Sequence, residues 1–107
     1  MSSTLEQIRE LVANVQIRIS DHGYDELAAD GILAREAVQG LASAVLVEDY
    51  PDYPKGPCVL VREKDNEQRY IHVLWGIPRG KTEPAVLITA YRPDPEIWDN
   101  DFLRRRR

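Results

Sequence analysis

The chain has few of the residue types that most often carry chemistry or crosslink a fold. It holds one cysteine, Cys58, and two histidines among 107 residues. A single cysteine excludes an internal disulfide, and no Cys-x-x-Cys pair offers a zinc site. No apolar stretch approaches the roughly 20 residues that a membrane-spanning helix needs, and the first ten residues are too charged for a signal peptide. We therefore expect a cytoplasmic protein that does not contact a membrane.

The chain also lacks an excess of positive charge. Its formal net charge is −4, which argues against a protein that coats nucleic acid through its phosphates. Basic residues gather at the end, in Arg104–Arg107, whereas acidic residues concentrate in the first half. Any contact with RNA is therefore expected to be local.

At this length the chain is expected to form a single domain over residues 1–107. Signals that predict helices lie in its first part. Ser3 and Glu6 form a capping box, followed by a helical stripe of Leu5, Ile8, Leu11, Val12 and Val15. Ser20 predicts the start of a second helix that Gly31 ends, with Tyr24, Leu27, Ala28 and Ile32 on its apolar face. A short third helix is expected over Ala34–Leu41, so the helices cover about residues 3–41.

From Ala44 onward the pattern changes to strands rich in β-branched and aromatic residues. Four are expected, over Ala44–Tyr50, Cys58–Lys64, Arg69–Ile77 and Ala85–Arg92. The polar run from Asp65 to Gln68 predicts a hairpin between the second and third. Helices followed by strands indicate an α+β fold, in which two or three helices pack on a four-stranded antiparallel sheet. The tail, residues 93–107, carries Ile97, Trp98 and Phe102 and is expected to fold back on the body.

The third and fourth of these strands bring together the residues best suited to chemistry. Strand alternation places Tyr70 and His72 on one face of the third strand. In the fourth, it places Val86, Ile88 and Ala90 on one face and Leu87, Thr89 and Tyr91 on the other. If both apolar sets face the helices, Tyr70, His72, Thr89 and Tyr91 share an open polar face. A one-residue slip of register, or a bulge at Gly76, would separate them.

Two histidines invite an acid–base interpretation. Cleavage of RNA by its own 2′-hydroxyl needs a base, an acid and a group that stabilises the charged phosphorane. His22 and His72 are the candidate base and acid, Tyr91 and Arg92 complete the candidate catalytic set, and Arg69, Tyr70 and Thr89 are candidate substrate-binding residues. No cofactor is needed for this chemistry.

Three alternatives use the same side chains. His72 is then a half-buried strand residue bound to a neighbour, and His22 an exposed histidine in an acidic patch. Zinc binding by His22, His72 and Cys58 is the third, although their spacing does not call for it.

Several short motifs, in order, resemble a bacterial family of domains of unknown function, DUF4258. They are Ser20–His22, Glu48–Pro51, Gly56–Leu60, Ile71–Val73, Thr89–Pro95 and Trp98, and the resemblance runs from about Ile17 to Arg106. That family is similar to the BrnT and RelE toxins, a class of metal-independent RNases. The resemblance implies a RelE/BrnT-like fold, an mRNA interferase activity and an antitoxin partner. It matches the family's two histidines to His22 and His72, and its T-x-Y-x-P to Thr89, Tyr91 and Pro93.

The segment after His22 departs from the family. Many members carry a basic residue one helical turn after this histidine, whereas this chain has Asp25, Glu26 and Asp30. Acidic side chains there repel RNA phosphate. Two functions therefore stand as expectations: a RelE/BrnT-like endoribonuclease or toxin, and a non-catalytic relative that binds another protein through its sheet edge, its Pro51–Pro57 loop or its Trp98 tail.

Overall fold

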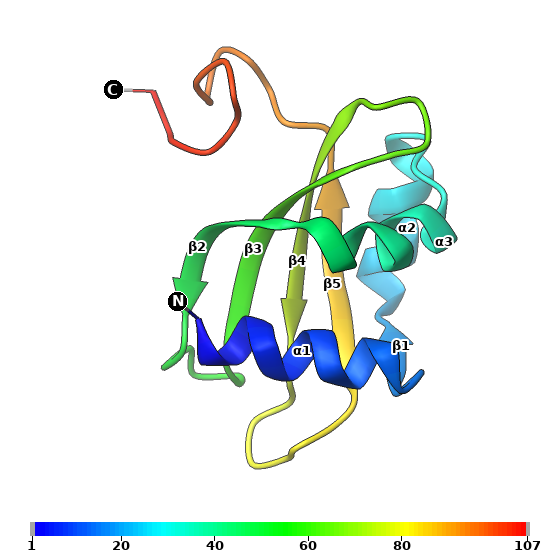
Figure 1. Ribbon diagram of the computed structural model, residues 1–107, viewed down its shortest axis with the longest axis vertical. Coiled ribbons are helices and arrows are strands. Elements are labelled where there is room, and N and C mark those ends of the chain that lie inside the picture. Colours follow the sequence, from blue (N-terminus) through cyan, green and yellow to red (C-terminus); the bar gives the residue numbers. More distant parts are fainter. Residues whose placement is uncertain (1, 107) are drawn as a thin grey trace.

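The computed structural model describes residues 2–106 and has an α+β fold with three α-helices and a five-stranded mixed sheet (Figure 1). Met1 and Arg107, and so the end of the Arg104–Arg107 run, lie outside the described residues. The elements are α1 (Ser3–Ala13), β1 (Ile17–Ile19), α2 (Asp21–Ala29), α3 (Ala34–Gln39), the 3₁₀ turn η1 (Gly40–Ser43), β2 (Val45–Tyr50), β3 (Cys58–Lys64), β4 (Tyr70–Gly76) and β5 (Ala85–Tyr91). None of the helices formed by residues 2–106 has the length and apolar character that crossing a bilayer requires.

The helix ends follow their capping residues. Ser2, one residue earlier than expected, caps α1 by accepting a hydrogen bond from the Leu5 N–H at 3.1 Å. Ser20 caps α2 through the Gly23 N–H at 2.9 Å, and Gly31 follows the helix with a φ of 63°, both as the sequence predicts. The third helix ends at Gln39, and its expected last turn is the 3₁₀ turn that buries Leu41.

Three residues predicted on apolar helix faces, Val15, Tyr24 and Ala28, are exposed to solvent. Val15 lies beyond the end of α1, where it is 81% exposed with a φ of 58°. Tyr24 on α2 is 56% exposed. In α2 the buried positions are Gly23 and Leu27, and Gly23 allows close approach because a Cβ there would lie 2.7 Å from the Leu87 carbonyl oxygen of β5.

The expectation of four antiparallel strands is wrong by one strand. The sheet order is β1-β5-β4-β3-β2, and β1 pairs in parallel with β5, with Ile17 opposite Ala85 and Ile19 opposite Leu87. A strand of three residues between two helices is too short to show a period of two, so alternation could not reveal it. The predicted hairpin between β3 and β4 is present and antiparallel.

Helices cover one face of the sheet, which we call the inner face. Figure 1 shows α1 crossing the strands on this side. The core lies between this face and the helices and includes Leu5 and Ile8 of α1, Leu27 of α2, Ala37 of α3 and Trp75 of β4.

A bulge in β5 decides which side chains reach the opposite, outer face. Leu74 pairs with Thr89 but Trp75 pairs with Leu87, so Ile88 has no partner on β4. Leu87 and Ala90 are therefore both in the core. The predicted alternation in this strand is therefore wrong at three residues. Leu87 was expected on the outer face and lies in the core, whereas Val86 and Ile88 were expected with Ala90 on the inner face and lie on the outer one. The predicted sharing of one face by Tyr70, His72, Thr89 and Tyr91 holds, because the bulge falls before Thr89.

The tail, residues 93–106, folds back as expected. In Figure 1 it runs, from orange to red, from the end of β5 toward the β2 side of the sheet. It closes on itself through hydrogen bonds from the Asp99 N–H to the Arg104 carbonyl (2.8 Å) and from the Arg106 N–H to the Ile97 carbonyl (2.7 Å). Trp98 is buried, with 3% of its surface exposed.

Candidate functional site

The outer face of the sheet has two halves. One half centres on the cross-strand row Arg62, His72 and Tyr91 of β3, β4 and β5, and the tail covers it. The other half, toward the opposite ends of the same strands, is open and forms a pocket.

His72 is enclosed by the tail and by Tyr91. Its side chain has no exposed surface. The ring packs edge-to-face against Trp98, with centroids 4.5 Å apart, and against Tyr91 at 5.2 Å. Its Nε2 lies 2.7 Å from the Phe102 carbonyl oxygen and its Nδ1 lies 3.1 Å from the Tyr91 hydroxyl.

These contacts assign the tautomer of His72. A carbonyl oxygen only accepts hydrogen bonds, so Nε2 carries the proton and donates it to Phe102, and Nδ1 accepts from the Tyr91 hydroxyl. Both ring nitrogens of the neutral imidazole are thus satisfied. Burial lowers the pKa of His72 and raises the pKa of Tyr91. The buried pair is therefore neutral at physiological pH.

Three further contacts fasten the tail over this half. The first is an ion pair of Arg105 with Glu48 of β2 at 3.1 Å. Within the tail, the same guanidinium stacks on Trp98 at 4.6 Å from the ring centroid. The Arg62 guanidinium donates to the Asp101 carbonyl at 2.7 Å. Phe102 packs edge-to-face on Tyr70 at 5.8 Å. The hydrogen bond from Arg105 lowers the pKa of Glu48, which keeps this carboxylate charged.

The covered half has a base but no path to it. Nδ1 of His72 is placed to take the Tyr91 proton, which is the geometry of a general base. The ring packs against Trp98 and Tyr91, and Nε2 is bound to the tail. With the tail in place, a substrate cannot reach either nitrogen.

The second candidate histidine stands elsewhere. His22 belongs to the first turn of α2, its side chain is 65% exposed, and its Nε2 lies 3.7 Å from the Glu26 carboxylate. None of the groups that enclose His72 belongs to α2. Within residues 2–106, no group of three or more His, Cys, Asp or Glu residues is arranged to hold a metal ion, and Cys58 of the zinc alternative is buried at the start of β3.

The two candidate arginines meet at one carboxylate away from His72. Asp65, in the turn between β3 and β4, binds the Arg69 guanidinium at 3.2 Å and the Arg92 guanidinium at 3.1 Å. The Arg92 N–H also donates to Asp30 at 2.8 Å. Of the other candidates, Tyr70 lies under Phe102, with the Arg62 guanidinium 4.3 Å from its ring centroid, and Thr89 is half-buried opposite Leu74. His72, Tyr91 and Tyr70 are thus gathered under the tail, and His22, Arg69 and Arg92 are not.

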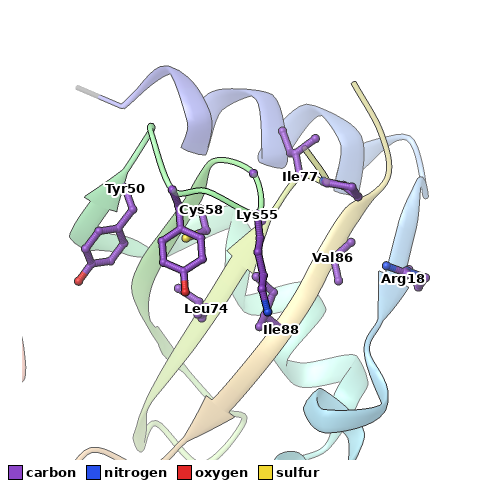
Figure 2. Close-up of a pocket in the computed structure, with 12 residues that line it drawn as sticks. Arg18, Tyr50, Lys55, Cys58, Leu74, Ile77, Val86 and Ile88 are labelled. Atoms are coloured by element: carbon purple, nitrogen blue, oxygen red, sulfur yellow. The ribbon is translucent and has the colours of Figure 1, made fainter. Parts of the chain in front are cut away.

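The open half of the outer face forms a pocket of about 410 Å³, which we call the open-face pocket. Its floor is the apolar surface of the sheet, from Cys58, Leu74, Val86 and Ile88. Burial raises the pKa of the Cys58 thiol, which keeps it uncharged. Figure 2 shows Lys55 extending over these strands, with Tyr50 on one side and Arg18 on the other.

Backbone hydrogen bonds hold the wall of this pocket. The loop after β2 is bonded to the segment after β4, from the Ile77 N–H to the Pro57 carbonyl and from the Arg79 N–H to the Lys55 carbonyl, both at 3.0 Å. Tyr50 donates its hydroxyl to Glu48 at 2.5 Å, and this bond to a carboxylate raises the pKa of Tyr50 to about 12. The pocket is therefore built on fixed backbone.

Sequence reasoning missed the open-face pocket, since its lining comes from all five strands and from two loops. The Pro51–Pro57 loop, whose prolines and glycine indicate a stiff turn, was the one available signal. It also missed the ion pair of Glu48 with Arg105, which joins residues 57 positions apart.

Comparison with known families finds one match, to the family described as Domain of unknown function (DUF4258), over residues 19–92. Among curated proteins and among solved structures, none matches this chain. The matched segment includes His22, Glu48, His72 and Tyr91, whereas the tail that covers His72 follows it. Because the match spans well over half of the sequence, the chain belongs to the DUF4258 family.

Proposed function

We propose that this protein is a non-catalytic protein-binding module, an inactive relative of the RelE/BrnT-like RNases, and that it binds its partner at the open-face pocket. One observation carries the proposal: the protein's own tail encloses His72, while the rest of the same sheet face stays open and apolar. The packing of helices on one face of an antiparallel β2–β5 sheet supports the RelE/BrnT-like part of the proposal.

The distribution of the candidate residues argues against RNA cleavage. An RNase of this kind needs an acid, a base and a phosphate-binding cation around one accessible phosphate. Here His72 is enclosed, His22 is exposed on another element beside Glu26, and Arg69 and Arg92 are both occupied by Asp65. The acidic side chains of α2 add repulsion next to His22.

The edge of the open-face pocket has the composition of a protein-binding surface. Tyr53 and Tyr50, in and before the Pro51–Pro57 loop, are 52% and 39% exposed. Exposed tyrosines beside an apolar depression are typical of protein interfaces, because they offer large contact area at low conformational cost. An antitoxin, as the family resemblance implies, is one partner that this surface would serve.

The catalytic part of the proposal is tested by incubating RNA, alone and with ribosomes, with the purified protein in EDTA. We expect no cleavage above background from wild type, His72→Ala or His22→Ala. Cleavage that leaves 2′,3′-cyclic phosphate ends and disappears in His72→Ala would overturn the proposal in favour of the endoribonuclease.

The binding part is tested by capture of partner proteins on immobilised wild type and on two matched variants. Tyr53→Ala removes an exposed tyrosine from the edge of the pocket, and Tyr24→Ala removes an equally exposed one from α2. We expect a partner that wild type and Tyr24→Ala retain and that Tyr53→Ala loses. Equal retention by all three proteins, or none by any, would contradict binding at this face.

A further inference from the structure

We infer that the open-face pocket binds a bulky apolar side chain of a partner protein whose neighbouring residues are acidic. This inference deepens the proposed function and rests on it for the nature of the partner as a protein.

The floor of the pocket calls for an apolar occupant. Leu74, Val86 and Ile88 present hydrocarbon, and the Cys58 thiol beside them is uncharged. Gly76 lies among them without a side chain, and a Cβ there would approach Ile88 Cδ1 to 2.9 Å. The volume of about 410 Å³ accommodates a phenylalanine or leucine side chain together with its backbone. A polar side chain would lose its hydration there without gaining a partner.

The charges around the pocket call for an anionic neighbour to that apolar group. Its lining includes two cations, Arg18 and Lys55, and no aspartate or glutamate. The charged residues of the lining are thus all positive, whereas the chain as a whole has a net charge of −4. Within residues 2–106 neither cation forms an ion pair inside 4.0 Å, although Arg69, Arg92 and Arg105 all do. Two unpaired cations beside an apolar floor are complementary to carboxylates that flank an apolar anchor.

The opening of the pocket fits an occupant that belongs to a longer chain. Arg18, Tyr53 and Lys55 are all exposed, so the pocket opens to solvent along its edge rather than enclosing a ligand. An anchoring side chain fills such a depression while its flanking residues run over the edge. The flanking carboxylates then meet Lys55, which Figure 2 shows extending over the floor, and Arg18, which it shows at the edge beyond Val86.

The test is a titration of ¹⁵N-labelled full-length protein with synthetic peptides, followed by amide chemical shifts. The probe is an acetylated decapeptide with one central phenylalanine flanked on both sides by aspartate and glutamate. We expect shifts centred on the amides of Cys58, Gly76 and Val86. Replacing phenylalanine by serine should abolish them, and replacing the acidic flanks by asparagine and glutamine should weaken binding about fivefold.

Protein variants separate this site from general attraction between charges. The double variant Arg18→Gln/Lys55→Gln should lower affinity for the acidic peptide about fivefold and leave affinity for the neutral one unchanged. The control, Arg35→Gln/Lys81→Gln, removes the same charge from two exposed positions outside the pocket lining, and should bind as wild type does. Equal loss in both double variants, or equal binding of the acidic and neutral peptides, would overturn the inference.

The outcomes also distinguish this inference from the proposed function. If the peptides fail to bind while capture still depends on Tyr53, the chemistry inferred for the partner is wrong and the binding module stands. If capture also fails, the inference and the proposed function are both wrong. A second copy of this chain also offers an apolar group with acidic neighbours, because α2 exposes Tyr24 between Asp21 and Asp25. Self-association in sedimentation that Tyr24→Ala and Tyr53→Ala each abolish would replace the partner protein by a second copy.

Discussion

Glu63 is a carboxyl group buried on the inner side of the sheet. Only 2% of its surface is exposed, and its Oε2 accepts a hydrogen bond from the Trp75 indole at 3.2 Å. Within residues 2–106 its Oε1 has no hydrogen-bond partner. Burial raises the pKa of Glu63 from 4.5 to about 8, so the group is protonated at neutral pH.

This burial predicts that the protein loses stability as the pH rises from 5 to 8. Between pH 4.5 and about 8 the folded protein holds a proton on Glu63 that the unfolded chain has released. The free energy of unfolding therefore falls with rising pH, by up to about 1.4 kcal/mol per pH unit, and levels off above the folded pKa. Glu63→Gln keeps an acceptor for Trp75 and cannot ionise, so urea denaturation at several pH values should show this fall in wild type only.

The matched control for this prediction is Glu10→Gln, on the exposed side of α1. It changes the same functional group without touching the core and should keep the wild-type pH dependence. A slope in Glu63→Gln as steep as in wild type would mean that another group carries it.

At the scale of elements, local patterns predicted most of the fold. β2 to β5 lie within one residue of their expected ends, because each has a clear run of β-branched residues between polar turns. β1 was missed, since its pairing depends on β5, almost 70 residues along the chain. The bulge at Ile88 was likewise invisible, because it is set by packing of Leu87 and Ala90 into the core.

The candidate site was predictable only in part, for a similar reason. Strand alternation placed His72 and Tyr91 on one face, which is a local property. Enclosure of His72 depends on Trp98 and the Phe102 carbonyl, 26 and 30 positions away, and no local pattern specifies where a tail docks. The open-face pocket combines two loops with a strand that was itself missed.

The loop that walls the open-face pocket depends on one glycine. Gly56 has a φ of 125°, and a Cβ there would collide with the Ile77 carbonyl oxygen. Gly80, in the next loop, has a φ of 75° and open space around it. Gly56→Ala should therefore lower the free energy of unfolding by about 3 kcal/mol, from strained backbone and steric collision together. Gly80→Ala should cost about 1 kcal/mol, from backbone strain alone.

Urea denaturation of the two variants beside wild type measures this difference. The N–H groups of Ile77 and Arg79 donate hydrogen bonds to carbonyls of the loop. Their amide chemical shifts should change in Gly56→Ala and remain unchanged in Gly80→Ala. Equal destabilisation by the two substitutions would show that the close approach of the loop to the segment after β4 does not constrain the fold.

For the molecule as a whole, the decisive feature is the position of the tail. The tail follows the segment that the family match spans, and it covers residues that belong to that segment. The match ends at residue 92, and residues 93–106 enclose His72 through Trp98 and Phe102. The charged groups near His72 are Glu48, Arg62 and Arg105, of which the carboxylate favours its protonation and the guanidiniums oppose it. Burial outweighs the carboxylate, so the enclosed His72 has a pKa below its ordinary 6.5.

The direction of this shift predicts that acid weakens the docking of the tail. Where the tail is released, His72 regains its ordinary pKa of 6.5 and binds a proton that the enclosed form excludes. Docking is therefore at full strength above pH 6.5 and weakens as the pH falls below it, by up to about tenfold at pH 5.5. Hydrogen exchange in residues 93–106, corrected for the intrinsic effect of pH, should report this release.

Two substitutions assign the effect to one histidine. His72→Gln keeps a donor for the Phe102 carbonyl but has no titratable ring, so exchange in the tail should no longer respond to pH between 7.5 and 5.5. His22→Gln removes the exposed histidine on α2 and should respond as wild type does, because nothing from α2 encloses His72. A pH response that survives in His72→Gln would contradict the assignment to His72, and it could not come from the Arg105–Glu48 ion pair, because the lowered pKa of Glu48 keeps that carboxylate charged throughout this range. A response confined to wild type and His22→Gln would make His72 the group through which acid opens the covered half of the sheet.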